Sequence, residues 1–282
     1  MGEIPVGLVV LRPLQHTNGN IAAFAEQEPL AAINREELYS WHPHTAIHSE
    51  ELAILSAMVA FQGGYSERLT RKFMYSALLH DAGKVSLAKH NTGLFDRELE
   101  DGDWKKISRH PEIGFYRLAY FPDPVVPIVA YKHHSVQGMR SYPDGPLNFR
   151  DPKSNTFVPD FERPNDSDSW FVESQEKRRI HDRMGVALQD SRTVEEVILI
   201  GQWVAALDAA QATWVGESPW GPREYLKEHL EGLDREQIAE KQSELWGKVA
   251  ADYSGDPKIM AVAMETVTQR YMSVDSSGIS IN

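Results

Sequence analysis

The 282-residue sequence contains no cysteine. Disulfide bonds, thiolate nucleophiles and zinc–thiolate sites are therefore excluded. A chain of this length can bury a core that is large enough to fold without such cross-links. The absence of cysteine also fits the cytoplasmic location that we expect.

Long apolar runs are absent as well. No stretch approaches the roughly 20 apolar residues that a membrane-spanning helix requires. The first residues, 1–5, lack the basic start and the long apolar stretch of a signal peptide. We therefore expect no membrane association.

The sequence also lacks an excess of positive charge. Its 29 Lys and Arg residues face 41 Asp and Glu residues, which gives a formal net charge of −12. Broad nucleic-acid binding requires a basic face, and we therefore do not expect it. A small phosphorylated or anionic substrate remains the expected partner, because a bound metal ion supplies its own positive charge.

Helical patterns dominate what is present. Apolar residues recur at helical spacing over 47–61 and 69–78, and Ser66 can cap the second of these helices. Asp101 or Asp103 can cap a helix that continues to about residue 120, and residues 125–134 form a short apolar helix. Further helices are expected over 193–212, where residues 193–196 resemble a capping box, from 234 to 246, and from 257 to 271. With one short strand pattern at 4–11, the fold class is predicted to be all-α.

The chain divides into three parts on composition. Residues 1–40 form an N-terminal extension packed on the main domain, which covers 41–282. Residues 144–190 form an insertion whose first part is rich in Pro, Asp, Asn and Ser and shows little periodicity. A loop of this length in a compact domain is often a lid or a binding element.

The pair His80 and Asp81 is the chemical centre of the sequence. It ends the apolar run 73–79 and combines two metal-ligand types at one point. Gly83 is expected to let the backbone turn sharply after the helix, and Lys84 places a cation beside any anion that a metal attracts.

Other candidate ligands lie beside apolar segments elsewhere in the chain. Asp208 lies in the middle of an apolar run, where a carboxylate needs a compensating charge. Imidazole and carboxylate without sulfur suit Fe, Mn, Zn, Ni or Co. The full set is too large for one ion, so two ions are implied, with Asp81 able to bridge them. The set consists of His48, His80, Asp81, His110, His133, His134 and Asp208.

These residues and their neighbours resemble the HD-domain superfamily, and within it the HD-GYP phosphodiesterase branch. The matching segments are 48–52, 79–84, 110–114, 133–134, Asp208, and Ser141-Tyr142-Pro143 in the place of Gly-Tyr-Pro. The resemblance implies an HD-domain helical bundle. It also implies that Asp81 and Lys84 take part in catalysis and that Lys84 and Tyr142 contact the substrate.

The resemblance further implies two metal sites. His48, His80, Asp81 and Asp208 would hold one ion. Asp81, His110, His133 and His134 would hold the other, with Fe or Mn expected. His44 and Gln211 stand where trinuclear members of the branch carry carboxylates, so a third ion is not expected.

Three functions are compatible with this ligand set. The first is a metal-dependent phosphohydrolase or phosphodiesterase that acts on a nucleotide or cyclic dinucleotide. The second is an HD-type mixed-valent diiron oxygenase that cleaves a C–C or C–P bond. The third is a catalytically silent module that senses a nucleotide. Lys84 and the match up to the pair His133-His134 favour the first.

Overall fold

The computed structural model describes residues 18–91, 94, 101–134, 174–215, 237, 240, 243–244, 247, 255–275 and 278–281. The predicted strand at 4–11, Tyr142 and its neighbours, and residues 144–173 of the predicted insertion lie outside this set. Most of the helix predicted over 234–246 also lies outside it.

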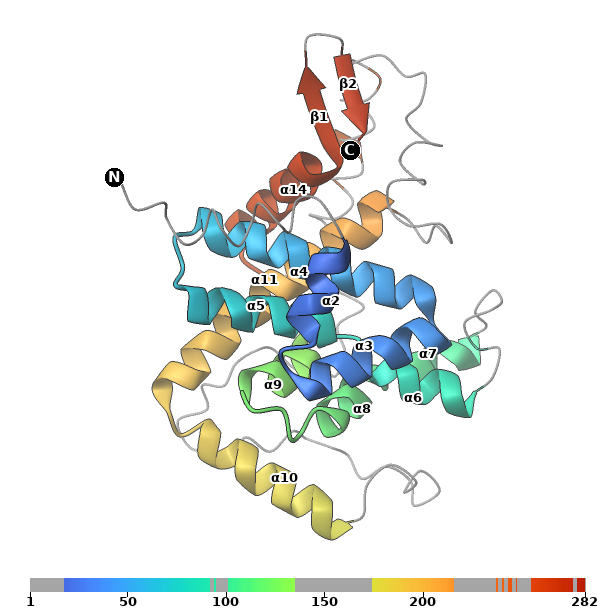
Figure 1. Ribbon diagram of the computed structural model, residues 1–282, viewed down its shortest axis with the longest axis vertical. Coiled ribbons are helices and arrows are strands. Elements are labelled where there is room, and N and C mark those ends of the chain that lie inside the picture. Colours follow the sequence, from blue (N-terminus) through green and yellow to red (C-terminus); the bar gives the residue numbers. More distant parts are fainter. Residues whose placement is uncertain are drawn as a thin grey trace.

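The described chain is almost entirely helical, which confirms the all-α prediction (Figure 1). The helices are α2 (Asn18–Ala25), α3 (Pro29–Trp41), α4 (Pro43–Gln62), α5 (Glu67–Leu79), α6 (Gly83–His90), α7 (Asp101–Ile107), α8 (His110–Arg117), α9 (Val125–Lys132), α10 (Ser174–Ala187), α11 (Ser191–Val215) and α14 (Pro257–Tyr271). A hairpin that the sequence did not predict follows α14. Its strands β1 (Met272–Asp275) and β2 (Gly278–Ile281) pair antiparallel, with Met272 opposite Ile281.

The antiparallel pair α4 and α5 forms the centre of the bundle. Pro43 occupies the first turn of α4, where a missing backbone N–H costs nothing, and the His42 side chain accepts a bond from the Thr45 amide. Ser66 caps α5 as predicted, because its hydroxyl accepts the Leu69 amide. Helices α9, α11 and α14 pack around this pair and bury one continuous apolar core.

Two helix boundaries differ from the prediction. The helix expected from 101 to 120 is broken, since α7 ends at Ile107 and α8 begins at His110. Pro111 explains the break, because it has no N–H to donate to the Ile107 carbonyl and its ring would clash with that carbonyl, whereas it fits the first turn of α8. Helix α11 begins before Thr193, because the Asp190 carboxylate accepts the amides of Arg192 and Thr193.

Parts of the predicted N-terminal extension and of the predicted insertion join the core of the main domain. Ile21 and Phe24 of α2 are buried there, and the Tyr75 hydroxyl of α5 donates to the Phe24 carbonyl. Helix α10, at the bottom of Figure 1, contributes Ile180 and Met184 to the same core. Among the residues that the structure describes, no helix combines the length and the apolar character needed to cross a membrane.

Candidate metal centre

Five helices deliver the predicted ligands to one region of the bundle. His48 lies within α4, and His80 and Asp81 follow the last residue of α5. The remaining ligands come from the start of α8, the end of α9 and the middle of α11. The structure gathers all seven into two groups, and within each group the ligand atoms lie within 4.8 Å of one another. The groups are Asp81, His110, His133 and His134, and His48, His80 and Asp208.

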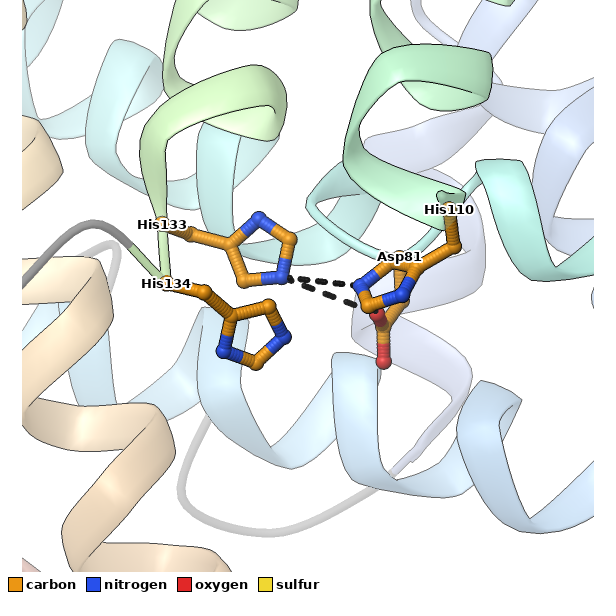
Figure 2. Close-up of side chains that lie close together, drawn as sticks. All are labelled: Asp81, His110, His133 and His134. Atoms are coloured by element: carbon orange, nitrogen blue, oxygen red, sulfur yellow. Dashed lines mark hydrogen bonds and ion pairs between the residues drawn. The ribbon is translucent and has the colours of Figure 1, made fainter. Parts of the chain in front are cut away.

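Asp81 faces both groups. Its Oδ1 lies 2.9 Å from Nε2 of His110 and 3.8 Å from Nε2 of His133. Its Oδ2 lies 3.3 Å from Nε2 of His80, which belongs to the other group. Figure 2 shows the imidazoles of His110 and His133 converging on the Asp81 carboxylate, with His134 beside them. The two oxygens of one side chain therefore point to different ligand groups.

Asp208 connects the same groups from the opposite helix. Its Oδ1 lies 2.9 Å from Nε2 of His48 and 3.8 Å from Nε2 of His80. Its Oδ2 lies 3.9 Å from Nδ1 of His134. A carboxylate in the apolar middle of α11 thus finds three imidazoles, which accounts for its place in a buried segment.

Three of the imidazoles are held in one tautomer by the same backbone contact. In each, Nδ1 lies 2.7 Å from the carbonyl oxygen three residues earlier. A carbonyl can only accept, so Nδ1 carries the proton and the neutral ring keeps its lone pair at Nε2. Histidines that bind metal show the same second hydrogen bond, which fixes the ring for coordination. The pairs are His80 with Ala77, His110 with Ile107, and His133 with Ala130.

The donor atoms fit a bound cation. Nε2 of His110 lies 3.2 Å from Nε2 of His133, although both nitrogens present lone pairs, and two such acceptors repel unless a positive charge lies near them. Nε2 of His80 and Oδ1 of Asp81 are buried and have no hydrogen-bond partner among the described residues. Buried polar atoms normally have partners, so these atoms are explained by an ion that they would hold.

The carboxylates are ionised in spite of their burial. Burial alone would raise the pKa of Asp81, but Lys84, His80 and His110 outweigh it and hold the pKa well below its usual range. Burial acts in the same direction on Asp208, and a hydrogen bond from His48 with the charges of nearby imidazoles lowers its pKa strongly instead. Both groups are therefore in the anionic form that binds metal.

The histidines respond to these charges in different ways. Burial and the neighbouring imidazoles hold the pKa of His133 well below its usual range, and burial lowers the pKa of His110 although Asp81 opposes it. Burial also acts to lower the pKa of His80, but Asp81 and Asp208 outweigh it and leave that pKa raised. The position of His80 therefore attracts a positive charge, which a proton or a metal ion can supply.

Lys84 and Gly83 begin helix α6 beside the ligands. Nζ of Lys84 lies 2.7 Å from Oδ2 of Asp81. A Cβ on Gly83 would lie 1.9 Å from the His110 carbonyl oxygen and 2.6 Å from the Gly114 amide nitrogen. The chain turns between α5 and α6 as expected, but Gly83 does not have a positive φ, so a left-handed conformation is not what requires a glycine here. It is needed because α6 and α8 approach each other at this point.

The sequence did not reveal every residue next to the ligands. Glu51 of α4 is bound by Arg270 and Tyr271 of α14, and Tyr271 also contacts Gln211 of α11. No local pattern marks these partners, because they are distant in the sequence. His44 is exposed and lies against the ring of His42, outside both ligand groups. Tyr142 lies outside the described residues.

Comparison with known proteins agrees with the expected relationship. The chain resembles phosphodiesterases of the HD-GYP branch, which confirms the resemblance seen in its motifs. The cyclic di-GMP phosphodiesterase response regulator RpfG of Xanthomonas campestris is 28% identical over 123 residues, which are 43% of this chain and 32% of that protein. The 3'3'-cGAMP-specific phosphodiesterase 3 of Vibrio cholerae is 29% identical over 108 residues, which are 36% of this chain and 22% of that protein.

These alignments span about a third or less of each relative. No family model matches the chain, and no solved structure matches it. The relatives and the His/Asp cluster together support a hydrolase of the metal-dependent phosphodiesterase kind.

Proposed function

We propose that this protein uses two metal ions to hydrolyse a phosphodiester bond of a cyclic dinucleotide. One observation carries the proposal, namely that the two oxygens of the buried Asp81 carboxylate face two separate groups of imidazoles. A bridging carboxylate of this kind is typical of two-metal hydrolytic centres. The similarity to phosphodiesterases that act on cyclic di-GMP and 3'3'-cGAMP supports the choice of substrate class.

The ligand sets follow from the two groups. His48, His80 and Asp208 would hold one ion and His110, His133 and His134 the other, with Asp81 shared between them. Iron or manganese is the expected metal, and zinc, nickel or cobalt suits the same donors. When bound, a metal pair of this kind activates water and offsets the negative charge of the phosphoryl oxygens.

The exposed edge of the centre indicates where the substrate approaches. His80, Asp81, His110 and His133 are buried, whereas His48, Lys84 and His134 are partly exposed. Lys84 is the cation on this edge, and its place beside Asp81 suits a contact with a phosphate oxygen. In the reaction, the water oxygen bonds to phosphorus, the bond from phosphorus to the ribose oxygen breaks, and a water proton ends on that oxygen.

The first experiment measures metal content and hydrolysis together. Protein purified without chelators is expected to contain two ions per chain by elemental analysis and to convert cyclic di-GMP or 3'3'-cGAMP to linear products. Removal of the ions should abolish turnover, and Mn²⁺ or anaerobic Fe²⁺ should restore it. Lys84→Met should keep both ions and lower kcat/KM by about 10- to 100-fold, if the lysine stabilises charge in the transition state.

Three outcomes would contradict this proposal. Protein that contains two ions but hydrolyses neither dinucleotide nor a panel of other phosphodiesters would rule it out. Substrate-dependent consumption of dioxygen would favour the oxygenase. Tight binding of a dinucleotide without turnover by the doubly loaded protein would favour a sensing module.

A further inference from the structure

A buried polar network lies one helical turn away from the contact between His48 and Asp208. Glu51 follows His48 by three residues in α4, and Gln211 follows Asp208 by three residues in α11. Residues three apart share a helix face, so both helices direct a ligand and a network residue to the same side. Helix α14 supplies the residue that joins Glu51 to Gln211.

That residue is Tyr271. Its hydroxyl lies 3.4 Å from Oε2 of Glu51, and Nε2 of Gln211 lies 2.8 Å from the same hydroxyl. Arg270 binds both oxygens of Glu51, through Nε at 3.0 Å and Nη2 at 3.1 Å. Since a carboxylate only accepts, Tyr271 donates to Glu51 and accepts from Gln211, so the hydrogen bonds have one consistent direction.

Burial makes this arrangement rigid. Tyr271 is 3% exposed and Gln211 is 1% exposed, so water does not replace a lost partner. Oε1 of Gln211 has no hydrogen-bond partner among the described residues, which leaves its contact with Tyr271 to orient the amide. The bidentate bond from Arg270 fixes the carboxylate at the other end.

The network joins the two helices that carry His48 and Asp208. Helix α14 packs against both α4 and α11 in the upper part of Figure 1. The other ligand group draws its imidazoles from the start of α8 and the end of α9, which the network does not join. A change at Tyr271 would therefore affect the two ligand groups unequally.

We propose that Tyr271 is a positioning residue that sets the separation of α4 and α11, and thereby tunes metal binding at His48, His80 and Asp208. The inference rests on the proposed function in that it takes these residues as the ligands of one ion. Tyr271 touches neither ion nor substrate in this role and acts through Glu51 and Gln211. The C-terminal helix thus controls one half of the centre.

The test compares two tyrosine variants by cobalt(II) titration, followed by visible absorption and by competition with a chelator. Tyr271→Phe keeps the ring and removes only the hydroxyl. It is expected to lower the affinity for one of the two cobalt ions by about 5- to 20-fold, near the lower end of the effect of outer-shell contacts, and to shift the d–d bands of that ion. The other ion should bind as in the wild type.

Tyr75→Phe is the matched control. It also removes a buried hydroxyl, one that donates to the Phe24 carbonyl away from the ligands, and it should leave both cobalt affinities unchanged. Gln211→Leu removes the partner of Tyr271 on α11 and should reproduce the selective loss if Tyr271→Phe does not fold. Equal weakening of both ions, or unchanged cobalt spectra in both Tyr271→Phe and Gln211→Leu, would overturn the inference.

The failure of this inference differs from the failure of the proposed function. Wild-type protein that binds two cobalt ions, together with unaffected variants, would refute the role of Tyr271 alone. Wild-type protein that binds a single ion would refute the two-metal centre and this inference with it.

Discussion

Asp81 concentrates more of the chemistry than any other described side chain. It lies between two groups of imidazoles and also forms an ion pair with Lys84. Its burial would favour the protonated acid, yet the surrounding positive charge holds its pKa well below the usual range. One residue therefore connects the two groups of candidate ligands.

This coupling predicts different effects for two ligand substitutions. Asp81→Ala removes the shared carboxylate and is expected to lose both ions, since each group then retains imidazoles with at most one carboxylate. His48→Ala removes a ligand from one group and should mainly weaken the binding of one ion. Elemental analysis after dialysis against a weak chelator distinguishes the two variants. An Asp81→Ala protein that keeps one ion at full occupancy would contradict the bridging role.

The sequence selected the residues that the structure brings together better than it selected the residues around them. His80 and Asp81 are adjacent, and the others lie beside apolar segments, so residue type and local pattern were sufficient to select them. Glu51 and Arg270 are 219 residues apart, and nothing in either segment specifies the other. Such pairs depend on how helices meet in space, which local periodicity does not encode.

Among the elements, α6 and α8 approach each other closely beside the candidate ligands. Gly83 lies against the backbone of His110 and Gly114, and backbone atoms cannot rotate away as a side chain can. The sequence signalled a glycine here, but its expected reason was a turn. The actual reason depends on α8, whose start at His110 was also hidden by the prediction of one continuous helix over 101–120.

Gly83→Ala should consequently disturb both stability and metal binding. The added Cβ must displace α8 and with it His110, so we expect a loss of about 1–3 kcal/mol in the free energy of unfolding. Urea denaturation measures this loss, and cobalt titration should show weaker binding of an ion. Gly185→Ala, in α10, is the control, because its Cβ would meet no atom within 4 Å. It should be neutral or slightly stabilising. A Gly83→Ala protein as stable as this control would contradict the close approach.

At the scale of the whole molecule, a charged network ties the helices together away from the metal centre. Nζ of Lys72 in α5 lies 2.5 Å from Glu196 of α11 and 2.7 Å from Asp123, which precedes α9. Arg68 also binds Glu196 at 2.5 Å. Burial would raise the pKa of Glu196, but hydrogen bonds from Lys72 and Arg68 outweigh it and lower the pKa.

A lowered pKa in the folded state gives a definite pH dependence. The stabilisation by Glu196 is complete above the pKa of an unfolded glutamate, about 4.3, and is lost as the pH falls through the lower folded value. Glu196→Gln should therefore lose stability at pH 7 and show a smaller further loss below about pH 4 than the wild type. Thermal unfolding from pH 3 to 7 measures both effects. The exposed neighbour supplies the control, and Glu195→Gln should follow the wild-type curve. Identical pH profiles for the two variants would contradict the role of this network.

The overall helical architecture was predictable because apolar periodicity and caps such as Ser66 are local features. The hairpin after α14 was not predicted, nor was the entry of Ile180 and Met184 from α10 into the main core. The pattern at 193–196 predicts a capping box, but the Glu196 side chain binds Lys72 and Arg68 of α5. Residues such as Ile180, Met184 and Glu196 were not predicted correctly because their partners lie on other helices.

The ion pair between Lys84 and Asp81 has a consequence for how the centre selects its metal. The ammonium group is tethered to the chain 2.7 Å from the carboxylate, so it competes with every ion that arrives at that oxygen. A sodium or potassium ion carries the same single charge as the Lys84 ammonium group, so replacing that group at the carboxylate yields little electrostatic energy. A divalent ion carries twice the charge and can also be coordinated by the nearby imidazole nitrogens. We therefore expect Lys84 to favour divalent over monovalent cations at the Asp81 carboxylate.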